Sequence, residues 1–110
     1  MSPESFRQLA LSFPGTEENP HFDRRAFKIT GKRIFATLHE KSISINLKLP
    51  QVDQKEYCDL DENAIYPVPN KWGLHGWTTV DLTRISDDIL LAALETAYNE
   101  ALSPGGKKKK

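Results

Sequence analysis

The stretch 42–49 constrains the fold more than any other part of this 110-residue chain. Apolar and polar residues alternate along it, and the apolar ones are Ile43, Ile45, Leu47 and Leu49. Successive side chains of a β-strand point to opposite faces, so this strand has one apolar face that must be buried. Helices packed on the sheet are the simplest cover. The stretch therefore predicts an antiparallel sheet with helices on one face.

Helices are predicted at both ends of the chain. Ser2-Pro3-Glu4 is a typical helix start, and Pro14-Gly15 ends the run of helically spaced apolar residues that follows it. Ser86 begins the second helix, whose apolar stripe we expect to pack on the strand at 42–49. That stripe consists of Ile89, Leu90, Ala93, Leu94, Ala97, Tyr98 and Leu102.

The middle of the chain alternates between strands and short connections. Strands at 26–30 and 33–39, joined by a turn at Gly31-Lys32, should form a meander with 42–49. The other expected elements are a polar loop at 16–24, a helix at 52–60, an edge strand at 64–68, an aromatic loop at 71–76 and a strand at 77–82. This order predicts one α+β domain over residues 1–102, followed by a disordered lysine-rich tail at 103–110.

The formal net charge is zero, but the charges are unevenly distributed. Residues 1–50 carry a net +3, residues 51–106 a net −7 and the four closing lysines +4. A dedicated nucleic-acid-binding domain is usually clearly basic. The body of this chain is not, which argues against broad DNA affinity and leaves room for a local basic face on the N-terminal half.

Cysteine usage and hydropathy predict a cytoplasmic protein. Cys58 is the single cysteine and has no partner for an internal disulfide, which fits a reducing compartment. No signal peptide is recognisable at the start of the chain, and no apolar run approaches the roughly 20 residues that a bilayer crossing needs. We expect a monomer that does not contact a membrane.

No recognisable catalytic or metal site stands out. His21, His39 and His75 do not pair at metal-ligand spacing, Cys58 has no nearby histidine or cysteine, and no glycine-rich phosphate loop occurs. A catalytic pair between Cys58 and a distant histidine stays open at this point. The pattern favours a protein that is not an enzyme and that needs neither metal nor cofactor.

Basic residues gather around the first predicted hairpin. The candidate nucleic-acid contacts are Arg25, Lys28, Lys32, Arg33 and Lys48, with Arg24 beside them. Basic side chains on a sheet face or a protruding hairpin can meet phosphates. The alternative is that they protect exposed strands against pairing with other chains.

Two tryptophans bracket a glycine-rich loop. The candidate ligand contacts are Trp72, His75 and Trp77. Such large rings either complete the core or offer a stacking surface to a ligand. Trp77 opens a strand, which favours the core, so Trp72 and His75 are the better candidates for ligand contact.

Several motifs, taken in order, resemble the MmcQ/YjbR family. They are Phe13-Pro14-Gly15-Thr16-Glu17-Glu18, Phe27-Lys28-Ile29-Thr30-Gly31-Lys32, Ile45-Asn46-Leu47-Lys48, Pro67-Val68-Pro69, Trp72-Gly73 with Gly76-Trp77-Thr78, and Val80-Asp81-Leu82. The resemblance runs through the chain to about Leu102. The amino-terminal domain of TfoX-like competence regulators shares the hairpin and is the nearest alternative family.

The resemblance implies an α+β fold called a double wing, in which an antiparallel sheet packs with helices and presents a concave face. It also implies DNA binding, because a similar architecture occurs in the DNA-binding half of a phage transcription factor. The first hypothesis is therefore a DNA-binding or transcription-accessory protein that binds double-stranded DNA weakly through its basic sheet face. The second is a small-ligand or protein-interaction module with an aromatic pocket near Trp72 and His75.

Overall fold

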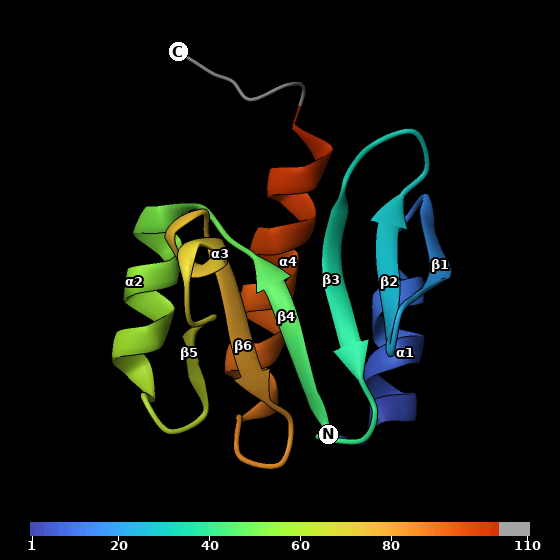
Figure 1. The fold of residues 1–110 in the computed structure, drawn as a ribbon. Helices are drawn as coiled ribbons and strands as arrows, with labels where there is room; N and C mark the ends of the chain where they lie inside the picture. The colour runs from blue at the N-terminus through green and yellow to red at the C-terminus, as the bar shows by residue number, and fades with distance from the viewer. Residues whose placement is uncertain (104–110) are drawn as a thin grey trace.

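The computed structural model describes residues 1–103, which form one antiparallel sheet and four helices (Figure 1). The helices are α1 (Pro3–Leu11), α2 (Gln51–Leu60), α3 (Lys71–Leu74) and α4 (Asp87–Leu102). The strands are β1 (Thr16–His21), β2 (Arg24–Ile29), β3 (Ile34–His39), β4 (Ser44–Lys48), β5 (Ile65–Pro67) and β6 (Trp77–Asp81). The tail predicted at 103–110 lies outside the described residues, except for Ser103.

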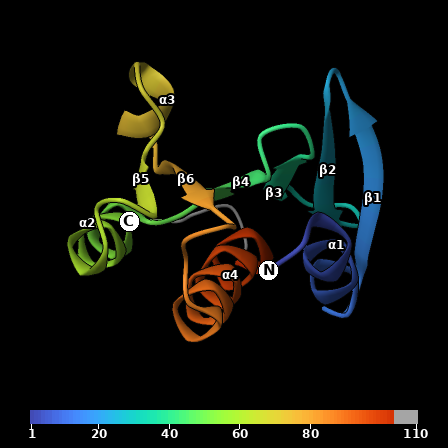
Figure 2. The ribbon, with the colours of Figure 1, turned by 90° about the horizontal axis from the view of Figure 1, so that it is seen from below.

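The sheet has the strand order β1-β2-β3-β4-β6-β5. Helices α1, α2 and α4 lie on one side of it, and the other side is open (Figure 2). Two projections flank the open side: the β1–β2 hairpin at one edge, and α3 with its flanking loops (68–76) at the other. We call them the hairpin wing and the aromatic wing. The predicted α+β fold with a concave face is confirmed.

The covered face of the sheet forms the core. Ile45, Leu47 and Leu49 are fully buried there, as are Ala93, Leu94 and Ala97 of α4. The predicted packing of the central strand on the last helix is thus confirmed. On this face Phe6 of α1 also meets Phe27 edge to face, with ring centroids 5.8 Å apart.

Two members of the predicted apolar stripes depart from the prediction to different degrees: Ile43 still packs against the core but lies outside the strand, and Leu102 is exposed. Ile43 sits in the turn before β4 with a φ of 53° and is half-buried, so the alternation of the buried strand begins at Ile45. Leu102 is 42% exposed, and Ala101 is buried in its place. Residue 101 follows Ala97 by four positions, which returns it to the same helix face, whereas 102 has rotated past it.

The predicted helix starts are confirmed by their caps. Ser2 Oγ accepts a hydrogen bond from the Ser5 amide at 3.1 Å, and Ser86 Oγ accepts one from the Ile89 amide at 3.4 Å. No helix among residues 1–103 has the length and the apolar character that a bilayer crossing demands.

The predicted polar loop at 16–24 is wrong. Residues 16–21 form β1, an edge strand that pairs with β2 in continuous antiparallel register. It has no apolar alternation because it is half exposed, and its Pro20 is tolerated at a sheet edge. Its Glu18 carboxylate instead bridges Arg7 at 2.6 Å and Arg25 at 2.9 Å. The predicted aromatic loop contains the one-turn helix α3.

Candidate ligand site on the open sheet face

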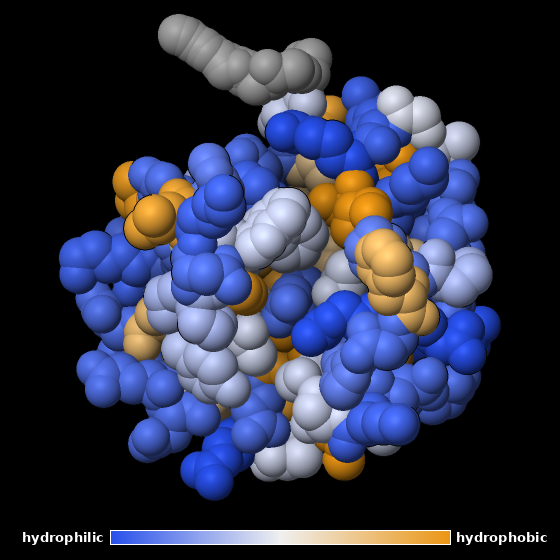
Figure 3. All heavy atoms as spheres, in the orientation of Figure 1, coloured by the Kyte–Doolittle hydropathy of each residue, from blue (hydrophilic) through white to orange (hydrophobic). Residues whose placement is uncertain are grey.

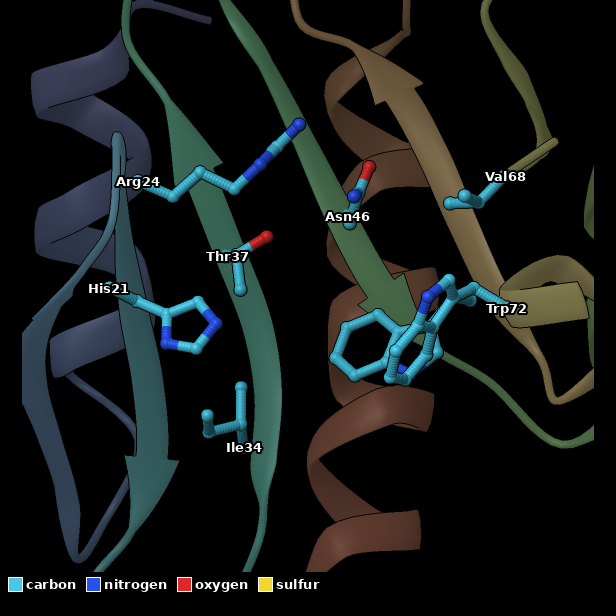
Figure 4. A pocket seen from close by; sticks show the side chains of 8 residues that line it. His21, Arg24, Ile34, Thr37, Asn46, Val68 and Trp72 are labelled. Atoms are coloured by element: carbon cyan, nitrogen blue, oxygen red, sulfur yellow. The ribbon is translucent and has the colours of Figure 1, made fainter. Parts of the chain in front are cut away.

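A pocket of about 250 Å³ lies on the open face between the two wings. We call it the inter-wing pocket. His21, Arg24 and Ile34 line one side, Thr37 and Asn46 the floor, and Val68, Trp72 and Trp77 the other side (Figure 4). The whole face is mostly hydrophilic, with apolar and intermediate patches over its centre (Figure 3).

An irregularity in β3 shapes the floor. Phe27 pairs with Ala36, whereas Lys28 pairs with Ile34, so Phe35 is an extra residue in β3. Phe35 and Ala36 are both fully buried, and Ile34 and Thr37 both line the open pocket. A regular strand would have placed Ile34 and Thr37 on opposite faces.

Thr37 is buried in this floor without a hydrogen bond. Its side chain is 7% exposed, and its Oγ1 has no partner among the described residues. The neighbouring Asn46 on β4 is held in place because its Oδ1 accepts a hydrogen bond from Thr79 Oγ1 at 2.8 Å. The floor therefore offers one anchored amide and one unsatisfied hydroxyl.

Arg24 reaches over this floor from β2 (Figure 4). Its Nη1 is buried and has no hydrogen-bond partner among the described residues. The other four arginines each have a partner: Arg7, Arg25 and Arg33 donate hydrogen bonds to Glu18, to Glu40 and to the carbonyl of Glu100, and Arg84 forms an ion pair with Asp81. No acidic side chain of the described residues lines the pocket. Its formal charge is therefore positive.

Close backbone contacts pack the aromatic wing on itself, through Gly73, and against Leu49 at the end of β4, through Gly76. A Cβ on Gly73 would lie 2.1 Å from the carbonyl oxygen of Val68, and one on Gly76 only 1.9 Å from that of Leu49. Asn70 Oδ1 accepts a hydrogen bond from the Trp72 amide at 2.9 Å and so caps α3. The Trp72 side chain, 60% exposed, is thereby placed over the pocket by a wing with little freedom to shift.

The sequence places the chain in a family. The model of the YjbR family matches residues 11–100. The chain belongs to the YjbR family. Among curated proteins, none matches this sequence significantly.

Two solved structures share the fold of this YjbR protein. A Deinococcus radiodurans protein with a DUF419 domain has a TM-score of 0.82 and 20% identity, with 97% of this chain and 83% of that chain covered. A Pseudomonas syringae protein has a TM-score of 0.68 and 18% identity, with 92% of this chain and 99% of that chain covered. At such identities the likeness shows the fold alone.

The candidate nucleic-acid residues of this YjbR protein do not share one surface. Arg25 pairs across the sheet with buried Leu38, so it points to the covered side, where it bonds Glu18 and Glu40. These hydrogen bonds, that to Glu40 first, raise the pKa of the Arg25 guanidinium. Lys28 lies 3.9 Å from the carboxylate of Glu17.

Arg33 and Lys48 come together beside the end of α4. Arg33 Nη2 donates to the Glu100 carbonyl at 2.9 Å. Burial lowers the pKa of the Lys48 ammonium, and the Arg33 charge acts in the same direction against the opposing effect of Glu100. Lys32 is exposed in the β2–β3 turn and forms no ion pair with the described residues.

Of the candidate ligand contacts, the structure brings two to the pocket. Trp72 and Trp77 line it, whereas His75 is an exposed residue at the end of α3 and does not. Sequence reasoning missed His21, Thr37 and Asn46. One signal was present for Thr37, because it is the single polar residue within the apolar run from Ile34 to Leu38.

No metal centre is visible in the described part of the chain. No group of three or more histidine, cysteine, aspartate or glutamate side chains is placed there to hold an ion. Burial raises the pKa of the Cys58 thiol, with the charge of Asp59 adding to the effect. A raised pKa keeps the thiol protonated and less nucleophilic near neutral pH.

Proposed function

We propose that this YjbR protein is a binding protein that holds a small ligand in the inter-wing pocket. One observation carries the proposal: Thr37 Oγ1 and Arg24 Nη1 are both buried in this pocket, and neither has a hydrogen-bond partner among the described residues. Buried polar groups in folded proteins are almost always paired, because an unpaired one costs about 1–3 kcal/mol. Both atoms are shielded from solvent, so a ligand that enters the pocket and shifts the Arg24 and Thr37 side chains would supply both partners.

The aromatic side of the pocket supports the same function. Trp72 is 60% exposed and adds little to the core. It is nevertheless held in place by a capped helix and by two glycines packed on backbone. Ligand pockets typically combine apolar and aromatic walls with a few converging polar groups. The inter-wing pocket has both.

The chain contains its own probe for this proposal. Both of its tryptophans line the pocket, so intrinsic fluorescence responds to binding there, and Trp72 separates this response from that of the second cavity, beside Arg33 and Lys48, which Trp77 alone also lines. Titration with benzamide and with benzoate should give a saturable change in emission for at least one of them. Amide NMR shifts should concentrate at Thr37, Asn46 and Trp77.

Trp72→Ala should weaken the binding of these probes by roughly threefold to tenfold, because one aromatic contact contributes about 0.5–1.5 kcal/mol. Leu74→Ala is the matched control, since Leu74 is also exposed on α3 but lies outside the pocket. If neither probe binds saturably at the pocket, the proposal is wrong.

DNA binding by the basic residues near the β2–β3 turn is our second proposal, supported by Lys32, which is exposed and forms no ion pair within residues 1–103. With Arg25 on the other face, four contacts remain: Lys28, Lys32, Arg33 and Lys48. They would give weak binding with a slope of about −4 in log affinity against log salt. Lys32→Ala should flatten the slope by about 0.9, and Lys55→Ala on α2 should not. Binding that vanishes when residues 107–110 are deleted and is unchanged in Lys32→Ala would reject a DNA site on the sheet face.

A further inference from the structure

We infer that the ligand of the inter-wing pocket is a small anion that carries a flat apolar ring. The inference rests on the proposed function and adds the charge, the shape and the size of the ligand. It is argued from Arg24, from the residues around it and from the volume of the pocket.

The charge follows from the guanidinium of Arg24. A guanidinium has five N–H donors in a planar fork and keeps its charge at any ordinary pH. Elsewhere in the described chain each arginine bonds a carboxylate or a carbonyl, yet Arg24 is half-buried and bonds neither. A carboxylate or phosphate group matches this fork, and hydrogen bonds between two charged groups are stronger than neutral ones.

The neighbours of Arg24 favour the same anionic group. The Thr37 hydroxyl has no partner in residues 1–103, and it can rotate to donate a hydrogen bond to a carboxylate or phosphate oxygen. The imidazole of His21 on the same wall can donate another. A cationic ligand would find no carboxylate among the described lining residues.

The opposite wall sets the shape. Trp72 and Trp77 present indole rings, and Val68 adds an aliphatic surface. A planar ring stacks on an indole or meets its edge. The anionic head would therefore lie over Arg24 and Thr37, and the ring would lie toward the aromatic wing.

The size follows from the volume. At about 250 Å³ the pocket is smaller than the range for drug-sized ligands, which begins near 300 Å³. A ligand with one ring and one anionic group fits this space. Carboxylate and phosphate heads share the same recognition chemistry, so the experiment separates them.

Three probes of nearly equal shape test the charge: benzoate, benzamide and benzamidine carry negative, zero and positive charge. Binding is followed by tryptophan emission and by NMR shifts at Thr37 and Asn46. We expect benzoate to bind at least about tenfold more tightly than benzamide, because hydrogen bonds to a charged group are roughly twice as strong as neutral ones. Benzamidine should not saturate. Phenyl phosphate, compared with benzoate, identifies the preferred head group.

Variants locate the effect. Arg24→Gln should lower the affinity for benzoate about tenfold and leave that for benzamide unchanged. Arg25→Gln is the matched control, since Arg25 is the next residue of the same strand and points to the other face. Thermal unfolding of both variants checks that each is folded.

The outcomes separate this inference from the function on which it rests. If benzoate, benzamide and benzamidine bind equally, or if Arg24→Gln leaves benzoate affinity unchanged, the pocket binds ligands and the anion inference is wrong. If no probe binds saturably at the pocket, the proposed function itself is wrong.

Discussion

Thr78 and Thr37 are two buried threonines of the same sheet, and they lie on opposite faces. Thr78 pairs across the strands with Leu47 on the covered face, is fully buried, and donates its hydroxyl to the Gly76 carbonyl at 3.0 Å. Thr37, on the open face, is 7% exposed and has no partner among the described residues. The two arginines of β2 show the same contrast. Arg25 faces the covered side and donates hydrogen bonds to Glu18 and Glu40, whereas Arg24 faces the pocket and its Nη1 has no partner among the described residues. Thr78 and Arg25 on the covered face thus have partners within the chain, whereas Thr37 Oγ1 and Arg24 Nη1 at the pocket have none among the described residues; Thr16 Oγ1, opposite Ile29 at the edge of the covered face, is the third buried atom without one.

The largest loss of stability should come from a substitution on the covered, apolar face of the sheet. Ile45 and Asn46 are neighbours on β4 that face opposite ways. Ile45→Ala should lower the free energy of unfolding by about 2–5 kcal/mol, because it leaves a cavity in the core. Asn46→Ala should cost about 1 kcal/mol, the typical contribution of its one hydrogen bond to Thr79. Urea titration measures both. Equal costs would contradict the assignment of the two faces.

A second pair of variants compares two turn glycines, one after the hairpin wing and one in the aromatic wing. Gly31, in the turn that follows the hairpin wing, and Gly76, in the aromatic wing, both have positive φ, at 76° and 100°. Gly31→Ala should cost only about 1–2 kcal/mol, since a Cβ there meets nothing within 4 Å. Gly76→Ala adds a backbone clash with Leu49, so it should cost clearly more and broaden the NMR signals of α3. A smaller loss for Gly76→Ala would mean that the aromatic wing is not held as tightly as described.

The two threonines give the sharpest test of the open face. Thr78→Val should destabilise the protein by about 1 kcal/mol, through the loss of a satisfied hydrogen bond. Thr37→Val should stabilise it by about 1 kcal/mol, because an unpaired hydroxyl leaves a buried site. The same Thr37→Val change should weaken benzoate binding. Chemical denaturation of both variants distinguishes them, and a loss of stability in Thr37→Val would show that its hydroxyl is satisfied without a ligand.

The smallest effect concerns the two arginines and stability alone. Arg24→Gln should leave the melting temperature unchanged, since the guanidinium has no partner among the described residues to lose. Arg25→Gln should lower it slightly, because the exposed bonds to Glu18 and Glu40 contribute little. Calorimetry compares the two, and a larger loss for Arg24→Gln would point to an internal partner for this side chain.

The sequence predicted the apolar half of this molecule better than the polar half. The alternation from Ser44 to Leu49 and the stripe of α4 are periodic signals that burial enforces, so the core and the helix cover followed from them. β1 has no such period, because an edge strand is held by backbone pairing and by ion pairs such as Glu18 with Arg25. Its existence was therefore missed.

The pocket was predicted in part, for a related reason. Trp72 and Trp77 are conspicuous by type, so they could be singled out. Arg24 and Arg25 are adjacent and chemically identical, and the strand predicted at 26–30 begins after both of them; once β2 is known to begin at Arg24, its alternation places Arg25 on the face of the buried Phe27 and Arg24 on the pocket side. Ile34 was hidden by the extra residue in β3, since alternation counted back from the buried Leu38 and Ala36 would have placed it on the covered face.

The extra residue Phe35 also determines how relatives of this chain must be compared. Side chains of a strand alternate between its two faces. A relative that lacks this extra residue in β3, or has a second one, would therefore have the side chains on one flank of the position turned to the opposite face of the sheet. Residues aligned by letter alone with Ile34 could therefore stand on opposite faces in two proteins. A comparison of pocket residues across relatives should first locate this irregularity in each of them and only then align the residues before and after it.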